Sequence, residues 1–194
     1  MRVIAGKAKG RKLKAPAGLD TRPMTDRIKE SLFSILGARV PGSRVLDLFA
    51  GSGAVGIEAL SRGAAWAVFV DRDARAVGVL KENLGTCGMD PAAEVYRSDV
   101  QRALQVLEER GCRFDLVFLD PPFADLQAGT DALGMLDRGD LLERGATVVL
   151  RLPHKAAPPG GLERLRAVDA RTYGESTLYF YEYGGKGEDG NGTV

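Results

Sequence analysis

The sequence predicts a doubly wound α/β domain with five parallel strands and a C-terminal antiparallel hairpin. Short apolar runs, typical of strands buried on both faces of a parallel sheet, alternate with stretches whose apolar residues recur at helical spacing. A glycine-rich turn follows the first run, and several runs end in an acidic residue. The last two runs are separated only by Gly174-Glu175-Ser176, which indicates a hairpin and not another strand–helix unit.

Length and composition predict one domain and exclude several classes of protein. With 194 residues, 44% of them hydrophobic, the chain can bury one core and is short for two, so residues 1–183 are expected to form a single domain. No apolar run reaches the roughly 18 residues of a membrane span, and the basic N-terminus lacks an apolar signal segment, so a cytoplasmic protein is expected. Cys87 and Cys112 are too few for a disulfide framework, and His154 is the single histidine, so no metal site is expected.

A basic extension, residues 1–29, opens the chain. Residues 1–19 contain six lysines and arginines and no acid, although the formal net charge of the whole chain is only +1. Such a segment suits contacts with a phosphate backbone, and a solvated tail is the alternative interpretation. The residues expected to make these contacts are Arg2, Lys7, Lys9, Arg11, Lys12, Arg22 and Arg27.

An amphipathic helix is predicted at the end of this extension. Ile28, Leu32, Ile35 and Leu36 recur at helical spacing, and Thr25 or Asp26 is the expected N-cap. Residues 37–42 then lead into the first strand.

The first strand and the turn after it predict a cofactor-binding loop. Residues 45–49 are apolar except for Asp47, and a carboxylate near the end of a buried strand is costly unless a partner pairs with it. Gly51, Gly53 and Gly56 allow the backbone to turn sharply and to approach a ligand at the N-terminus of the next helix. Open α/β sheets bind their cofactors at this place.

The charge of Asp47 favours one cofactor over another. Residues 51–56 match the dinucleotide fingerprint G-x-G-x-x-G, and Asp71 follows at about the spacing of its ribose-binding acid. A pyrophosphate would lie beside the negative charge of Asp47, whereas the ammonium of S-adenosylmethionine could pair with it directly or through water. S-adenosylmethionine is therefore the predicted cofactor, and a glycine turn with a solvated Asp47 is the alternative without a ligand. The residues expected to bind it are Asp47, Phe49, Ala50, Gly51, Gly53, Asp71, Arg72, Asp99 and Val100.

The second and third strands, residues 65–71 and 94–100, repeat the pattern of an apolar run with an acid near its end. Asp71 could accept both ribose hydroxyls of a nicotinamide or an adenosyl cofactor, or it could cap the helix that starts near Asp73. Asp99 could accept a hydrogen bond from an adenine amine, or it could cap the helix that follows.

The fourth strand, residues 114–119, ends in Asp120-Pro121-Pro122-Phe123, a turn that the two prolines keep extended. An exocyclic amine is a poor nucleophile because its lone pair is delocalised into the ring. If the Asp120 carboxylate and the Pro121 carbonyl accept its two hydrogens, the lone pair can face a methyl donor. Phe123 would stack on the base, so all four residues are candidate catalytic residues. A proline-capped strand end with Phe123 in the core is the alternative.

The remaining chain predicts the other edge of the sheet. After a helical stretch at residues 126–136, residues 146–152 form the expected fifth strand, and residues 165–173 and 177–183 form the expected hairpin. Residues 184–194 are glycine-rich and polar, so a disordered tail is expected there.

Together these motifs resemble a known family. Asp47, the turn at residues 49–53 and the motif at residues 120–123 resemble the class I methyltransferases that modify amino groups of nucleic-acid bases. Residues 22–33 and 56–63 are similar to the RsmD family over about residues 1–183, although Met24 stands where the family usually has a second threonine. Members of that family methylate the 2-amino group of one guanine in bacterial 16S ribosomal RNA. The resemblance implies the seven-stranded methyltransferase sheet and, as partner of the basic extension, ribosomal RNA or a small-subunit assembly particle.

Two other functions agree with parts of the sequence. A non-catalytic RNA-binding or ribosome-assembly factor would use residues 1–29, although a scaffold has no need of Asp47, Asp71 and Asp120 at successive strand ends. An NAD-dependent oxidoreductase would use the glycine fingerprint, but no hydride-site residue is evident, and His154 is expected in a loop.

Overall fold

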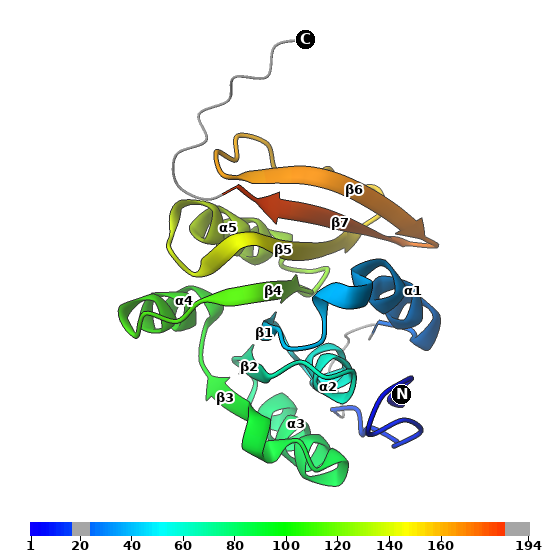
Figure 1. Cartoon of the computed structure of the whole chain (residues 1–194). Helices are drawn as coiled ribbons and strands as arrows, with labels where there is room; N and C mark the ends of the chain where they lie inside the picture. The colour runs from blue at the N-terminus through cyan, green and yellow to red at the C-terminus, as the bar shows by residue number, and fades with distance from the viewer. Residues whose placement is uncertain (17–23, 185–194) are drawn as a thin grey trace.

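Seven strands form one sheet in the order β3-β2-β1-β4-β5-β7-β6 (Figure 1). The computed structural model describes residues 1–16 and 24–184, so the predicted contact at Arg22 and residues 185–194 of the predicted tail lie outside the described residues. Strands β1 to β5 are parallel, β7 pairs antiparallel with β5, and β6 pairs antiparallel with β7, which confirms the predicted α/β class and C-terminal hairpin. The strands are β1 (Arg44–Leu48), β2 (Trp66–Asp71), β3 (Ala93–Arg97), β4 (Phe114–Leu119), β5 (Leu142–Pro153), β6 (Leu165–Tyr173) and β7 (Ser176–Tyr183).

Helices cover both faces of the sheet. Helices α1, α2 and α3 pack on one face and α4 and α5 on the other, as the two hydrophobic clusters and Figure 1 agree. Along β1, Val45 belongs to the first cluster and Leu46 and Leu48 to the second, because successive side chains of a strand point to opposite faces. The helices are α1 (Asp26–Leu36), α2 (Ala54–Ser61), α3 (Ala74–Cys87), α4 (Val100–Glu109) and α5 (Leu126–Arg138), with short 3-10 turns η1 (Gly37–Arg39) and η2 (Asp90–Ala92).

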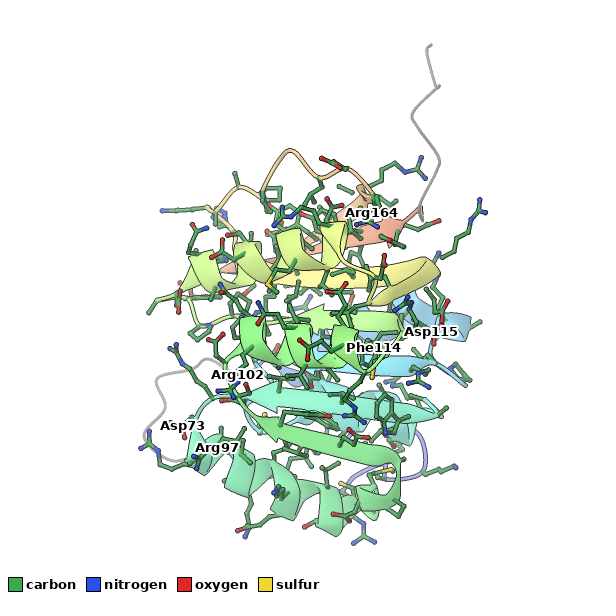
Figure 2. The ribbon with its side chains drawn as sticks, turned by 90° about the vertical axis from the view of Figure 1, so that its left-hand side faces the viewer. Asp73, Arg97, Arg102, Phe114, Asp115 and Arg164 are labelled. Atoms are coloured by element: carbon green, nitrogen blue, oxygen red, sulfur yellow. The ribbon has the colours of Figure 1, made fainter. Side chains whose placement is uncertain are left out.

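The parallel strands direct their carboxyl ends to one edge of the sheet. Figure 2 shows Asp73 and Arg97, at the ends of β2 and β3, on one side and Phe114 and Asp115, at the start of β4, on the other. The acidic strand ends found in the sequence therefore lie at a common edge.

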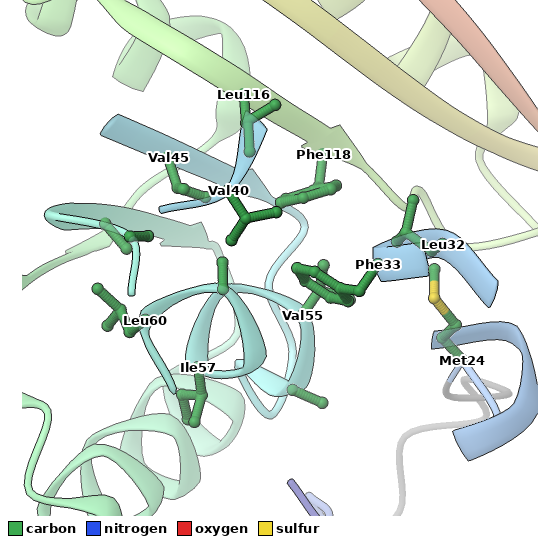
Figure 3. Close-up of a cluster of buried hydrophobic side chains, with 14 of the residues drawn as sticks. Met24, Leu32, Phe33, Val40, Val45, Val55, Ile57, Leu60, Leu116 and Phe118 are labelled. Atoms are coloured by element: carbon green, nitrogen blue, oxygen red, sulfur yellow. The ribbon is translucent and has the colours of Figure 1, made fainter. Parts of the chain in front are cut away.

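Helix α1 packs its apolar side against α2 and the sheet. The rings of Phe33 and Phe118 lie 5.9 Å apart between centroids, and Figure 3 shows both in a cluster with Met24. Thr25 is the N-cap, with its hydroxyl oxygen accepting from the Ile28 N–H at 3.4 Å. One part of the predicted apolar side is wrong, because Ile35 is 37% exposed and Lys29, at 1%, is buried.

The start of the basic extension is docked on α2. Val3, Ala8 and Leu13 are buried, and the Ser61 hydroxyl donates to the Ala5 carbonyl at 2.5 Å and accepts from the Ala8 N–H at 3.0 Å. Gly6 has no room for a side chain, because a Cβ there would lie 1.8 Å from the Ser61 carbonyl oxygen. A free solvated tail therefore does not describe residues 1–14.

The cysteines and the single histidine lie outside the residues predicted to bind a ligand. Cys87 is half-buried and Cys112 buried, both as free thiols, and His154 is exposed in the turn after β5. Among residues 1–16 and 24–184, no group of three His, Cys, Asp or Glu side chains could hold a metal ion. Within the same ranges, no helix has both the length and the apolar character of a membrane span.

Candidate active site

A cleft of about 580 Å³ lies at the carboxyl ends of the parallel strands. Its volume falls within the usual range of ligand-binding pockets, roughly 300–1,000 Å³. The cleft brings together the turn after β1, the end of β2, the loop before α4 and the motif after β4. Of the predicted cofactor-binding and catalytic residues, those that line it are Asp47, Phe49, Ala50, Gly51, Asp71, Arg72, Asp99, Val100, Asp120, Pro121, Pro122 and Phe123.

The glycine turn after β1 lines the cleft with Phe49, Ala50 and Gly51. Phe49 has φ of 62°, the one positive value for a non-glycine residue in the described chain, and such strain is typical of ligand sites. A Cβ on Gly51 would meet no atom within 4 Å, so its backbone faces open space that a ligand can occupy. Gly53 does not line the cleft; it is the N-cap of α2, and a Cβ there would lie 2.0 Å from Leu80 Cδ1. Gly53 therefore shapes the turn by close packing.

Asp47 lies at the bottom of the cleft and is 2% exposed. Its Oδ2 atom accepts the Gly56 N–H at 2.9 Å, and a Cβ on Gly56 would approach this oxygen to 3.0 Å. The pKa of Asp47 is raised to about 8, mainly because the carboxyl is buried. The hydrogen bond from Gly56 opposes this rise, and the negative charges of Asp120 and Asp71 contribute to it. A cation bound beside Asp47 would reverse this shift.

The pKa of Asp47 makes cofactor affinity depend on pH. Because the carboxyl of the ligand-free protein is largely protonated below about pH 8, and an ammonium favours the carboxylate, binding at neutral pH should release a proton. Affinity for S-adenosylmethionine should therefore rise with pH between about 5.5 and 7, by up to about tenfold per unit, while the amino group of the cofactor stays charged. Isothermal titration calorimetry in buffers of different ionisation enthalpy measures both effects. Asp47→Asn should bind more weakly and without proton release; an unchanged release in this variant would contradict the assignment.

Asp71 fixes the loop and still faces the cleft. Its Oδ2 atom accepts the Gly51 N–H at 2.8 Å, and its Oδ1 atom accepts the Asp73 N–H at 2.9 Å. Asp73, not Asp71, caps α3. Each carboxylate oxygen has two lone pairs, so Asp71 retains acceptors for ribose hydroxyls. Arg72 is exposed and pairs with Asp125 at 3.8 Å.

Asp99 caps helix α4, which is one of the two roles that the sequence left open. It is the N-cap of α4, with its Oδ1 atom accepting the Gln101 N–H at 2.9 Å, and it also lines the cleft. The capping role therefore explains its position, and the role toward adenine stays a prediction.

The motif after β4 lines the cleft beside the end of β1, where the Asp120 N–H donates to the Leu48 carbonyl at 3.5 Å. Pro121 is buried and packs on α5, where a Cβ on Gly129 would lie 2.5 Å from Pro121 Cγ. The Pro122 carbonyl accepts the Asp125 N–H at 2.8 Å. Phe123 is 38% exposed, so it is not a core residue and its ring is available at the mouth of the cleft.

Arg151 of β5 is a cleft residue that sequence reasoning missed. Its Nη1 atom lies 3.1 Å from both carboxylate oxygens of Asp120, and its guanidinium carbon lies 5.2 Å from the centre of the Phe123 ring. Desolvation raises the pKa of Asp120, and the charge and hydrogen bonds of Arg151 oppose this rise. The available signal was a single charged residue within the predicted strand, residues 146–152.

A second missed group connects the basic extension to the domain. Glu58 of α2, fully buried, accepts the Ile4 N–H at 2.7 Å and the Ala5 N–H at 3.0 Å, and lies 3.5 Å from Lys29 Nζ. Lys29 therefore adds no charge to the surface. Asn83 of α3 donates to the carbonyls of Lys14, at 3.0 Å, and Ser52, at 2.9 Å, and so ties the extension to the glycine turn.

The basic residues predicted for phosphate contacts lie on the surface, except Arg22, which is outside the described residues. The side chains of Lys7, Lys9, Arg11, Lys12 and Arg27 are exposed, and Arg2, also exposed, pairs with Asp26 at 3.4 Å. Figure 1 shows this N-terminal segment beside α2, on the side of the sheet that carries α1 to α3.

The fold and this cleft define a class. A seven-stranded sheet in which β7 is inserted antiparallel between β5 and β6, with the glycine turn and the acidic strand ends in one cleft, is that of the class I methyltransferases. The methyl donor of the class is S-adenosylmethionine. The donor set fits it, since the cleft offers Asp47 and Asp71 as carboxylate acceptors and an open backbone at Gly51.

Comparison with known proteins places the chain in a family. A family model described as conserved hypothetical protein 95 matches residues 1–182, and the chain belongs to this family, the RsmD family that its motifs indicated. It is similar to "Putative rRNA methyltransferase YlbH" of Bacillus subtilis (strain 168), with 43% identity over 182 residues, 94% of this chain and 98% of the relative. The "Ribosomal RNA small subunit methyltransferase D" of Haemophilus influenzae (strain ATCC 51907 / DSM 11121 / KW20 / Rd) is 37% identical over 150 residues, 76% of each chain. The solved structure of "Putative methyltransferase yhhF from Escherichia coli" superposes with a TM-score of 0.80 at 32% identity, covering 95% of this chain and 98% of the other.

Proposed function

We propose that this protein methylates the exocyclic 2-amino group of a guanine in bacterial 16S ribosomal RNA. The observation that carries the proposal is that Asp120-Pro121-Pro122-Phe123 and all the proposed cofactor residues except Gly53 line one cleft. The names of the relatives YlbH and ribosomal RNA small subunit methyltransferase D support ribosomal RNA as the substrate. The partner is the RNA itself or a small-subunit assembly particle.

The cofactor residues bind and orient the methyl donor. S-adenosylmethionine supplies an electrophilic methyl group on its sulfonium. Asp47 pairs with the ammonium, Asp71 accepts the ribose hydroxyls, and Asp99 accepts from the adenine amine at the mouth of the cleft. Gly51 lets the backbone approach the methionine part, since no protein atom lies within 4 Å of its Cβ position. Phe49, Ala50, Arg72 and Val100 complete this part of the cleft, and Gly53 holds the turn in shape.

The motif after β4 prepares the target amine for attack. The Asp120 carboxylate and the Pro121 carbonyl accept hydrogen bonds from its two N–H groups. These bonds draw the nitrogen toward tetrahedral geometry and free its lone pair for attack. Pro122 keeps the turn extended, and its carbonyl bond to Asp125 fixes it. Phe123, partly exposed, offers a face on which the guanine stacks.

The target base must leave its helix or come from a loop to enter this cleft. The basic extension is suited to hold the surrounding backbone, because its backbone is docked on α2 while its cationic side chains point to solvent. The proposed RNA contacts are Arg2, Lys7, Lys9, Arg11, Lys12, Arg22 and Arg27.

The direct test is transfer of a radiolabelled methyl group from S-adenosylmethionine to ribosomal RNA from a strain that lacks the gene. Naked RNA and small-subunit particles serve as parallel substrates, and mass spectrometry of the digested product locates the methyl group. Labelled 2-methylguanine supports the proposal. RNA binding without transfer would favour a ribosome-assembly factor, and a methyl group on another atom would contradict the guanine assignment.

Neutralising the basic extension should weaken RNA binding without affecting the cofactor. Replacing Lys7, Lys9, Arg11 and Lys12 by glutamine removes up to four phosphate contacts. The magnitude of the slope of log affinity against log salt concentration should therefore decrease by up to about 3.6, because each contact contributes roughly 0.7–0.9. Filter binding at several salt concentrations measures the slope, and calorimetry checks the cofactor.

The matched control changes cations at the other edge of the sheet. Arg166 and Arg171 of β6 are exposed, and β6 lies far from the N-terminal segment in Figure 1. Replacing them by glutamine should leave the salt slope unchanged. A loss of cofactor binding in the quadruple variant, or an equal loss of RNA binding in the control, would contradict the assigned roles.

A further inference from the structure

We propose that Arg151 is a positioning residue for methyl transfer, which holds the Asp120 carboxylate ionised and oriented and supports the Phe123 ring. The inference rests on the proposed function, because Asp120 and Phe123 are assigned there to the target amine and its base. Arg151 lies near the end of β5, is 5% exposed, and reaches both residues with one guanidinium.

Hydrogen bonds on two sides of its guanidinium hold Arg151 in position: one to the hairpin and the others to Asp120 in the cleft. Its Nε atom donates to the Ser176 hydroxyl at 3.2 Å, at the start of β7, so the hairpin strand orients the guanidinium plane. Its Nη1 atom donates to both oxygens of Asp120, each at 3.1 Å. Each oxygen keeps a second lone pair, so Asp120 can still accept a hydrogen of the target amine.

The same guanidinium supports the base-stacking residue. Its carbon lies 5.2 Å from the Phe123 ring centre, within the range of a cation–π contact. A ring held on one side by Arg151 presents its other face to a base. Arg151 therefore sets the relative position of the two groups that would hold the base and its amine.

The charge of the cleft explains why Asp120 needs a cation. Besides Asp120 and Arg151, the charged side chains that line the described part of the cleft are Asp47, Asp71, Arg72, Asp73, Asp99 and Asp125. Arg72, the other cation among them, pairs with Asp125 at 3.8 Å. Without Arg151, desolvation would favour the protonated form of Asp120, which has lost acceptor capacity.

Three variants of the full-length protein separate charge from geometry. Arg151→Gln removes the charge, Arg151→Lys keeps it without the planar group, and Ser176→Ala removes only the hydrogen bond to Nε. The measurement is kcat at saturating S-adenosylmethionine and ribosomal RNA between about pH 5.5 and 9. For Arg151→Gln, kcat at pH 7 should fall at least about tenfold and the acid limb of the profile should move up by about one pH unit or more, so that activity recovers at high pH. Arg151→Lys and Ser176→Ala should lower kcat with the acid limb near its original position.

A purely structural role for Arg151 predicts a different result. It would lower kcat of Arg151→Gln by the same factor at every pH, and that outcome, or a native profile, overturns the inference. A carbon-13 NMR titration of the Asp120 carboxyl in the ligand-free protein gives a readout that does not depend on activity. The pKa of Asp120 should be higher in Arg151→Gln than in the native protein, and equal values would also overturn the inference. If the native protein transfers no methyl group at all, the proposed function fails, and the titration still decides whether Arg151 controls the charge of Asp120.

Discussion

Replacing Asp120 by alanine should lower kcat by on the order of a hundredfold or more, as for loss of one preorganised polar contact in an active site. The reason is that the target amine loses the acceptor that frees its lone pair. The affinity for S-adenosylmethionine should stay nearly unchanged, because the residues proposed to bind the cofactor, among them Asp47 and Asp71, are left in place. Single-turnover methylation assays measure the chemical step, and calorimetry measures cofactor affinity.

Asp120→Ala is expected to change stability as well as catalysis, so a second substitution at this position is needed. Asp120→Ala removes a carboxylate that pairs with the buried guanidinium of Arg151, which destabilises the native state as well. Asp120→Asn keeps the volume and one acceptor oxygen, so it should melt near the native temperature while kcat falls by at least about tenfold. Asp131→Ala, which removes a carboxylate of α5 that does not line the cleft, is the control and should keep native activity. Full methylation by Asp120→Ala would refute the role given to Asp120.

Replacing Glu58 by alanine should lower the free energy of unfolding by about 3–5 kcal/mol, the usual cost of removing one partner from a buried ion pair. Glu58 is fully buried and holds the Ile4 and Ala5 N–H groups, and Arg62 Nε donates to it at 2.8 Å. Its loss also removes the carboxylate partner at 3.5 Å from Lys29 Nζ; Lys29 is 1% exposed, and its Nζ atom also donates to the Arg2 carbonyl at 2.6 Å. Urea denaturation measures the change in stability, and hydrogen exchange at residues 1–14 should show release of the extension.

A second ion pair on the same extension provides the comparison. Lys14 and Glu82 are 2.7 Å apart, but their side chains are 71% and 58% exposed. Glu82→Ala should therefore change the free energy of unfolding by less than about 1 kcal/mol, because exposed pairs gain little over their hydration. Equal effects of Glu58→Ala and Glu82→Ala would mean that burial does not account for the role of Glu58.

A docked extension gives the proposed RNA contacts a fixed position relative to the cleft. Asn83 hydrogen-bonds both Lys14 and Ser52, so the segment that carries the cations and the turn proposed to bind the cofactor share one buried side chain. Release of the extension by Glu58→Ala should consequently weaken RNA binding even though none of the proposed phosphate contacts is changed.

Local sequence patterns were sufficient for the elements of this fold and for most of the residues that line the cleft. Residues 114–119, an apolar run, and residues 165–173, a strand-like run that ends at the hairpin turn, are strands with the predicted bounds, because short runs between turn residues have few other stable states. Asp47, Asp71 and Asp120 lie in one cleft because parallel strands bring their carboxyl ends to one edge of the sheet. The family was indicated by the resemblance of the motifs at residues 22–33 and 56–63 to the RsmD family.

Only the tertiary structure decided which distant groups pair. The order of the strands, with β7 between β5 and β6, follows from packing that no local period encodes. Asp120 and Arg151 are 31 residues apart, and Ile4 and Glu58 are 54 apart, so neither contact leaves a trace in a window of helix or strand length. Ile35 was expected on the buried side of its helix from its spacing, yet it is 37% exposed. Lys29, at the end of the basic extension, is buried because a buried carboxylate on α2 compensates its charge.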